Sequence, residues 1–218
     1  MYLKHKWKPH DNTGLDIKVK IRKDLLTGFD NPAVLDCFAG GGRIYQEVYQ
    51  GMNYLGLDRK KGVDDRVLLC IDNRRYLRSA DLSRFNIFDL DAYGSAWEQL
   101  YIILGRRRFI PHERVAIFIT DGTDFTTRMG DITHRIKPLL GIPKLMTIPC
   151  LNRHLLFIQK LLIKTALGRA RLVLERGLLG YNPRKSAVYI GLLAGFQGDF
   201  PFPSPDPTFP SPEAVPPR

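Results

Sequence analysis

Two segments decide the fold: Val34-Leu35-Asp36-Cys37-Phe38-Ala39-Gly40-Gly41-Gly42-Arg43 and Tyr54-Leu55-Gly56-Leu57-Asp58. Their spacing, about twenty residues, is typical of one βαβ unit. Each segment begins as a short apolar strand, the glycines allow the backbone to turn tightly against a ligand, and residues 44–50 have helical periodicity. Asp58 ends the second strand, where a carboxylate can accept both hydroxyls of a ribose. The sequence therefore predicts a nucleotide-type cofactor site.

Charge indicates which cofactor fits. Asp36 stands just ahead of the glycine turn, where it would repel the pyrophosphate of a dinucleotide. The third glycine of the dinucleotide pattern is also absent, because Tyr45 occupies its place. S-adenosylmethionine carries no phosphate, and its ammonium group would be attracted by a carboxylate beside the loop. We therefore predict S-adenosyl-L-methionine as the cofactor.

The first half of the chain resembles the Rossmann-like methyltransferases, with Asp36 and the glycines matching their first motif and Asp58 their second. The apolar strand 67–71 ends at Asp72-Asn73, where the resemblance implies an acidic side chain that holds the adenine amino group. An alternative reading is a turn or a helix N-cap before residues 74–77. The cofactor-binding residues that we predict are Asp36, Phe38, Gly40, Gly42, Asp58, Arg59, Asp72 and Asn73.

A third motif concerns the reaction. Residues 85–95, Phe-Asn-Ile-Phe-Asp-Leu-Asp-Ala-Tyr-Gly-Ser, predict a strand that runs into a polar turn. They resemble the D-x-D-P-F/Y-G-S motif of tRNA guanine-N2 dimethyltransferases and, less closely, the Asp/Asn-Pro-Pro-aromatic motif of amino-methylating enzymes. Ala92 stands where the family has a proline that fixes the turn. Residues 115–123 look like the V-T-A-T-D stretch of the same tRNA enzymes, so the resemblance extends from Pro32 to Thr123.

The catalytic candidates are Asp91, Tyr93 and Asp89. A carboxylate at Asp91 can accept hydrogen bonds from an exocyclic amine, while the ring of Tyr93 stacks on the base. Asp89 either faces the cofactor or caps the next helix. The resemblance implies direct methyl transfer to an exocyclic amine of a nucleic-acid base. The small size and the absence of an evident target-recognition domain favour RNA or tRNA over DNA. The alternatives are a DNA adenine-N6 or cytosine-N4 methyltransferase and a catalytically inactive module that binds nucleic acid.

Composition favours a polyanionic partner. The formal net charge is +11 and the isoelectric point is near 9.7, which points to nucleic acid. A long connection, residues 122–149, follows the fifth predicted strand, and such connections usually carry recognition. We predict that it helps to select the substrate, and that His134 within it is the histidine to test for a substrate role. The predicted nucleic-acid contacts are Arg106, Arg107, Arg128 and Arg135.

Other chemistries find little support in the sequence. The 3 cysteines form no C-x-x-C pair and the histidines have no metal-ligand spacing, so we expect no disulfide scaffold and no metal. Cys37 and Cys70 are expected to be buried, in a reducing cytoplasm. The longest apolar region, 151–167, is interrupted by charged residues, so we expect no membrane span and read it as a helix on a sheet. Residues 1–8 lack the apolar core of a signal peptide.

The predicted architecture is an α/β fold of the Rossmann-like methyltransferase type. Strands near 33–36, 54–58, 67–71, 85–91 and 114–121 alternate with helices, which predicts a mostly parallel sheet with helices on both faces. Segments 171–175 and 187–193 predict a C-terminal antiparallel hairpin. We expect a basic lead-in over 1–31 with a strand or helix at 17–26, a methyltransferase domain over 32–195, and a proline-rich flexible tail over 196–218.

Overall fold

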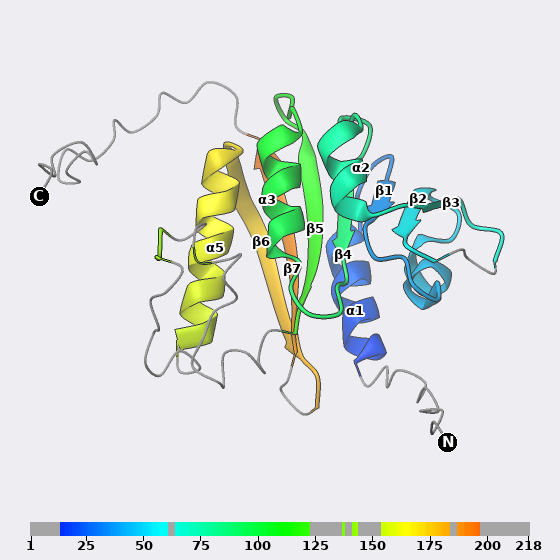
Figure 1. Cartoon of the computed structure of the whole chain (residues 1–218), viewed down its shortest axis with the longest axis horizontal. Coiled ribbons are helices and arrows are strands. Elements are labelled where there is room, and N and C mark those ends of the chain that lie inside the picture. The colour runs from blue at the N-terminus through cyan, green and yellow to red at the C-terminus, as the bar shows by residue number, and fades with distance from the viewer. Residues whose placement is uncertain are drawn as a thin grey trace, which may run out of the picture.

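A seven-stranded sheet forms the centre of the molecule, with the strand order β3-β2-β1-β4-β5-β7-β6 (Figure 1). The computed structural model describes residues 14–60, 64–122, 137, 141–143, 154–183 and 187–196. The strands are β1 (Ala33–Asp36), β2 (Asn53–Asp58), β3 (Leu68–Cys70), β4 (Ile87–Leu90), β5 (Arg114–Asp121), β6 (Leu172–Tyr181) and β7 (Val188–Phe196). The strands from β1 to β5 pair in parallel, and β7 is antiparallel to both β5 and β6. The predicted fold class, including the C-terminal hairpin, is confirmed.

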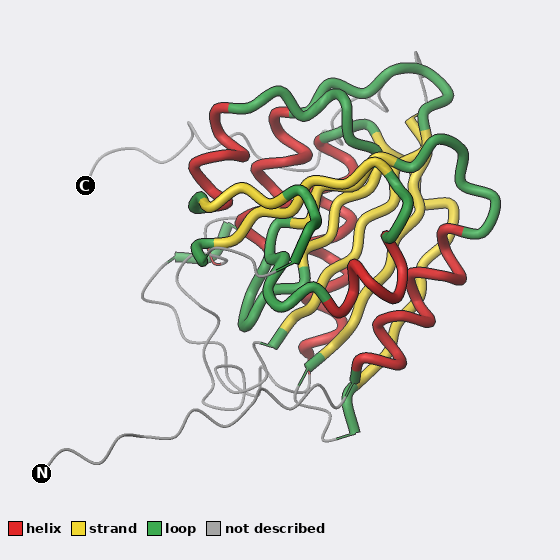
Figure 2. Tube along the Cα trace, turned by 90° about the vertical axis from the view of Figure 1, so that its right-hand side faces the viewer, coloured by secondary structure: helices red, strands yellow, loops and turns green. Residues whose placement is uncertain are grey.

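Helices cover both faces of this sheet (Figure 2). One face carries α1 and the short π-helical turn η1, and the other carries α2, α3 and α5 (Figure 1). Their bounds are α1 (Leu15–Leu26), η1 (Tyr45–Tyr49), α2 (Asn73–Ser79), α3 (Trp97–Arg106) and α5 (Leu155–Arg169). The segment predicted as a strand or helix at 17–26 is therefore helical. It packs on the sheet, although it lies in the region 1–31 that was predicted to precede the methyltransferase domain.

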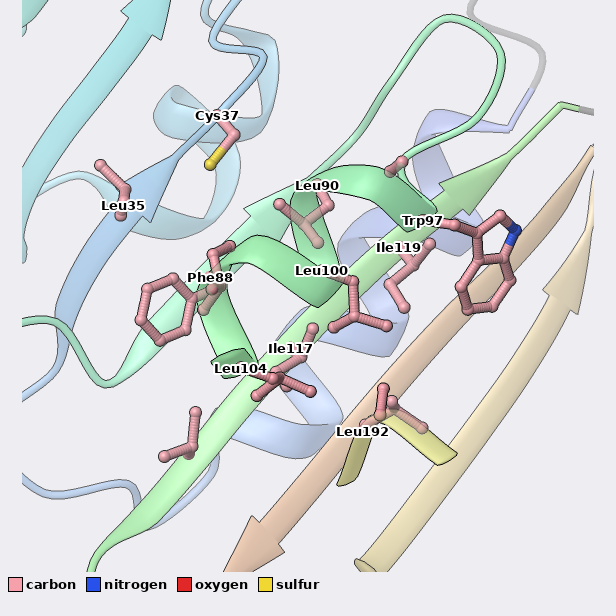
Figure 3. Packing of buried hydrophobic residues seen from close by; sticks show 14 of the residues in the cluster. Leu35, Cys37, Phe88, Leu90, Trp97, Leu100, Leu104, Ile117, Ile119 and Leu192 are labelled. Atoms are coloured by element: carbon pink, nitrogen blue, oxygen red, sulfur yellow. The ribbon is translucent and has the colours of Figure 1, made fainter. Parts of the chain in front are cut away.

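Side-chain alternation along the strands produces two hydrophobic cores. In β1, Leu35 points to the face of α3, whereas Val34 points to the face of α1, because successive residues of a strand face opposite sides. On the α3 face, Trp97 and Leu100 lie over Ile117 and Ile119 of β5 (Figure 3). Parallel strands that are covered on both faces consist of nearly continuous apolar residues, which is why β1, β4 and β5 were recognisable in the sequence.

Two features differ from the expectation. Among the described residues between β2 and β3, namely 59–60 and 64–67, none is helical, whereas a helix was expected between successive strands. Cys37 is buried as predicted, but Cys70 is exposed. The prediction for Cys70 is wrong because β3 is the edge strand of the sheet and its outer side has no neighbouring strand.

Neither a membrane-spanning helix nor a metal cluster occurs in the described ranges. There, none of the helices has the length and apolar character that crossing a bilayer requires. The same ranges contain no cluster of three or more His, Cys, Asp or Glu side chains arranged to hold a metal ion.

Candidate functional site

The glycine turn after β1 lies against the end of β2. The backbone N–H of Gly40 donates to Oδ2 of Asp58 at 2.9 Å, and the N–H of Lys60 donates to Oδ1 of the same carboxylate at 2.8 Å. Gly40 and Gly42 have φ angles of +45° and +79°, which favour glycine because a Cβ atom is strained in this region. The turn and the acidic strand end that the sequence predicted as one site are thus in direct contact.

The amino end of α2 reaches the same place. Nδ2 of Asn73 donates to the carbonyl of Cys37 at 2.7 Å, and Gln99 of α3 donates to Oδ1 of Asn73 at 3.2 Å. Asn73 therefore joins the start of the turn after β1 to α3. The predicted residues Asp58, Gly40 and Asn73 come together at the carboxyl ends of β1, β2 and β3.

Asp72 is the N-cap of α2, which was the alternative reading of the sequence. Its Oδ1 accepts from the N–H groups of Arg74 at 2.9 Å and Arg75 at 3.4 Å, and its Oδ2 forms an ion pair with Arg59. The hydrogen bond from Arg59 and the backbone N–H groups lower the pKa of the Asp72 carboxyl. The Arg59 side chain is 73% exposed. Arg59 and Asp72 thus pair with each other across the ends of β2 and β3, beside Asp58.

The expectation for Asp36 needs correction. Its carboxyl group is buried, with Oδ1 accepting from the N–H of Phe38 at 3.0 Å and Oδ2 from the hydroxyl of Tyr54 at 2.9 Å. Burial, reinforced by the charge of the neighbouring Asp89, raises the pKa of Asp36 to about 8. Both oxygens of this enclosed carboxyl group thus have partners within the protein. Asp36 instead anchors the first residue of the turn, Phe38.

Asp89 is also misassigned by the sequence, since it neither faces the turn nor caps α3. Its side chain points to the α1 face, where Arg22 donates through Nε at 2.7 Å and through Nη2 at 2.6 Å. The hydroxyl of Tyr49 donates to Oδ2 at 2.6 Å. Asp89 and Arg22 are both buried, and such a two-pronged ion pair orients its partners strongly. Asp89 therefore connects β4 to α1 through Arg22 and to η1 through Tyr49.

Asp91 lies just beyond β4 and contacts a residue that the sequence analysis missed. Nζ of Lys18, on α1, is 2.5 Å from Oδ1 of Asp91 and 5.1 Å from the centre of the Tyr189 ring. Burial opposes ionisation of Asp91, but the charges of Arg22 and Lys18 outweigh it and lower the pKa of this carboxyl. Lys18 and Arg22 are four residues apart on one helix face. That spacing was the available signal for Lys18.

Tyr93 presents an aromatic ring beside Asp91. The residue is 96% exposed, so most of its ring is open to a ligand. The following residue, Gly94, has φ +112°, and its carbonyl accepts from the N–H of Gly122 at 2.7 Å. The loop after β4 is thereby joined to the end of β5. An acceptor ring bound at this edge could stack on Tyr93 while its amine approaches Asp91.

One of the predicted nucleic-acid contacts is wrong. The Arg107 side chain is fully enclosed, where Nε donates to the carbonyl of Phe85 at 2.9 Å and the guanidinium pairs with Glu113. It cannot reach an external ligand. Arg106 is exposed, although its guanidinium also donates to the carbonyl of Leu77. The remaining predicted residues, Arg128, Arg135 and His134, lie outside the described residues.

Comparisons with known proteins give a structural likeness. No protein-family model matches the sequence, and no curated protein matches it significantly. The N-methyltransferase NodS from Bradyrhizobium japonicum WM9, in complex with S-adenosyl-L-homocysteine, aligns with a TM-score of 0.51, at 6% identity, over 86% of this chain and 89% of that chain. The plantazolicin methyltransferase BpumL, also in complex with S-adenosylhomocysteine, aligns with a TM-score of 0.50, at 10% identity, over 85% of each chain.

This chain has the Rossmann-like methyltransferase fold. In open α/β sheets of this type, ligands bind outside the carboxyl ends of the strands where the strand order reverses. That position lies between β1 and β4 here. The glycine turn follows β1 and Asp91 follows β4, so the two predicted halves of the site flank the reversal point of the methyltransferase-like sheet.

Proposed function

We propose that the chain is an S-adenosylmethionine-dependent methyltransferase that methylates an exocyclic amine of a nucleic-acid base, with RNA as the first candidate. The observation that carries the proposal is the contact between Gly40 and Asp58, with Asn73 beside them at the strand ends. The fold supports the cofactor assignment, because the methyltransferases NodS and BpumL are both in complex with S-adenosylhomocysteine.

The glycine turn fits a nucleoside cofactor. At Gly41, no described atom lies within 4 Å of the position that a Cβ atom would take, so a ligand can approach this part of the backbone closely. The Asp58 carboxylate retains lone pairs for the ribose hydroxyls beyond the two N–H groups that it accepts. Asp72 and Asn73, at the amino end of α2, would face the adenine edge, as the methyltransferase resemblance implies. When bound, the cofactor supplies an electrophilic methyl group on a sulfonium.

The protein's task is then to place a nucleophilic nitrogen. Asp91 would accept a hydrogen bond from the acceptor amine and so orient its lone pair, and Tyr93 would stack on the ring that carries the amine. Direct displacement needs no covalent enzyme intermediate. Correct placement of two reactants accounts for much of the rate acceleration in such reactions.

The choice of nucleic acid is supported by charge. Beside the net charge of +11, several arginines on the side of β3, α2 and α3 are exposed. Arg59 and Arg78 have side chains that are 73% and 58% exposed, and Arg75, Arg84 and Arg108 are also exposed. Such groups contact phosphates without reading sequence.

A nucleic-acid-binding module without catalysis is the second candidate. The observation that favours it is the ion pair between Lys18 and Asp91, which occupies one oxygen of the carboxylate that would receive the amine. A DNA amino-methyltransferase is the third candidate, because the same motif position serves both substrates.

Calorimetric titration with S-adenosylhomocysteine tests the proposal first. Micromolar binding is expected for the enzyme, and absence of binding would leave the inactive module. Incubation with cofactor labelled in its methyl group, and with separate pools of tRNA, ribosomal RNA and DNA, then identifies the acceptor. Label in an RNA pool is the expected result, whereas label in DNA alone would favour the DNA enzyme.

A further inference from the structure

Arg66 is a buried arginine with no place in the site described so far. It lies in the connection between β2 and β3, two residues before β3 begins, where the described residues form no helix. Its side chain is only 1% exposed. A buried guanidinium is costly unless its donors are satisfied, so its partners indicate why it is there.

Those partners are the backbone carbonyls of the glycine turn. Nη1 of Arg66 donates to the carbonyl of Ala39 at 2.7 Å, and Nη2 donates to the carbonyl of Gly40. Nε donates to Oδ1 of Asp64 at 2.8 Å. The planar fork of a guanidinium suits two neighbouring acceptors. Arg66 therefore forms hydrogen bonds with two consecutive peptide groups of the turn.

Gly40 is consequently held from two directions. Its carbonyl accepts from Arg66, while its N–H donates to Asp58. The guanidinium also excludes any larger residue at Gly42, because a Cβ atom there would lie 2.6 Å from Oδ2 of Asp64 and 2.9 Å from Nη1 of Arg66. The close packing of the turn against Asp64 and Arg66 thus requires glycine at position 42.

We propose that Arg66 is a positioning residue of the cofactor site. By fixing the carbonyls of Ala39 and Gly40, it orients the peptide that meets Asp58 and holds the turn in the conformation that leaves Gly41 open to a ligand. The buried side chain supports the turn from within, in a connection that has no described helix to pack against it. This inference rests on the proposed function, because it concerns the same cofactor site.

The test compares two buried arginines. Arg66→Met is expected to raise the Kd of S-adenosylhomocysteine about tenfold or more, since charged hydrogen bonds to the turn are lost. Arg66→Lys keeps the charge and one donor group, so an intermediate Kd is expected. Arg107→Met is the matched control, because Arg107 is also buried on backbone carbonyls and a carboxylate but lies away from the turn. It is expected to lower stability and to leave the Kd unchanged.

Each Kd is measured calorimetrically at a temperature where urea unfolding and circular dichroism show the variant to be folded. If Arg66 had only a general structural role, Arg66→Met and Arg107→Met would both lower the unfolding midpoint. Neither variant would then change the Kd. Should Arg66→Met not fold, Arg66→Lys and Asp64→Asn answer the same question, since each removes only part of the contact.

Three results would overturn the inference. An unchanged Kd in the folded Arg66 variants would show that the guanidinium does not position the turn. Tighter binding in Arg66→Met would show that the guanidinium occupies the place of the cofactor. Absence of binding by the unaltered protein would overturn the proposed function as well, so failure of the two proposals can be told apart.

Gly42→Ala gives an independent readout. In the unaltered protein this change introduces a strained φ and displaces the pair formed by Arg66 and Asp64. In the Arg66→Met background the clash with the guanidinium is removed, while the strained φ and the approach to Asp64 remain, so the additional rise in Kd is expected to be smaller than in the unaltered protein. Strictly additive effects on the Kd would contradict the role of Arg66.

Discussion

The ammonium of Lys18 lies 2.5 Å from the carboxylate of Asp91, although 73 residues separate them in the sequence. Four residues further along α1, Arg22 makes a second ion pair, with Asp89. These contacts place α1 within the candidate site, because they connect it to Asp89 in β4 and to Asp91 just after β4. The charge state of Asp91 is thus set by a helix that the motif itself does not include.

Lys18→Met should reduce stability and change its dependence on pH. The lowered pKa of Asp91 means that its ionised form stabilises the fold above its unfolded pKa, and that this contribution is lost as pH falls through the folded value. Removing Lys18 should cost about 1–3 kcal/mol at pH 7 and weaken the loss of stability in acid. Urea unfolding from about pH 2 to about pH 7 measures both effects. Lys20→Met, on the exposed side of α1, is the control and should change neither.

Asp91→Asn should slow methyl transfer while the cofactor still binds. The amide can accept one hydrogen bond but carries no charge, so the acceptor amine is less well oriented, and a loss of about a hundredfold in kcat is expected. The Kd of S-adenosylhomocysteine should change little. Single-turnover kinetics on the acceptor pool that takes up label measures the first effect and calorimetry the second. Full activity of the variant would remove Asp91 from the mechanism.

Asp58→Ala should act on the cofactor instead. Loss of the carboxylate removes the predicted acceptor of the ribose hydroxyls and releases the N–H of Gly40, so the Kd of S-adenosylhomocysteine should rise about tenfold or more. Asp81→Ala serves as the control, because Asp81 is an exposed carboxylate that accepts hydrogen bonds from the N–H and the hydroxyl of Ser83, away from the glycine turn. Equal affinities in the two variants would place the ribose elsewhere.

Asp36→Asn should make the free energy of unfolding decrease less steeply as the pH rises. The pKa of Asp36 is raised from 3.8 to about 8 by burial and by Asp89, so the native state keeps a proton that the unfolded chain releases. The contribution of Asp36 to stability is therefore full below about pH 4 and is lost as pH rises towards 8, by up to roughly 1.4 kcal/mol per pH unit. Urea unfolding across this range compares the two proteins. Parallel pH profiles would show that Asp36 titrates normally.

Two neighbouring arginines should separate nucleic-acid binding from stability. Arg108 is exposed, so Arg108→Ala should weaken the binding of labelled tRNA without a change in unfolding. Arg107 is enclosed and paired with Glu113, so Arg107→Ala should cost roughly 3–5 kcal/mol of stability and leave tRNA affinity of the folded protein unchanged. Fluorescence anisotropy and urea unfolding give the two readouts. The opposite pattern would mean that Arg107 is accessible to the ligand.

Local sequence patterns were sufficient to predict the strands of the sheet and the position of the glycine turn. The apolar strands, the glycine turn and Asp58 were recognised because strand alternation, glycine content and the length of a βαβ unit are short-range properties. The hairpin was also foreseen, although β6 and β7 are longer than predicted. Cys70 was misjudged because edge position depends on the order of strands, which neighbouring residues do not encode.

The sequence by itself determined which elements form and which strand ends carry acidic residues. The tertiary structure alone decided which of those carboxylates remain available at the strand ends, because that depends on the partners that distant segments bring. Asp58 stays at the glycine turn, Asp36 and Asp89 are enclosed beneath α1 and η1, and Arg66 reaches the turn from the β2–β3 connection. Strand periodicity specifies that a side chain faces one side of a sheet, whereas only the packed chain specifies what it meets there.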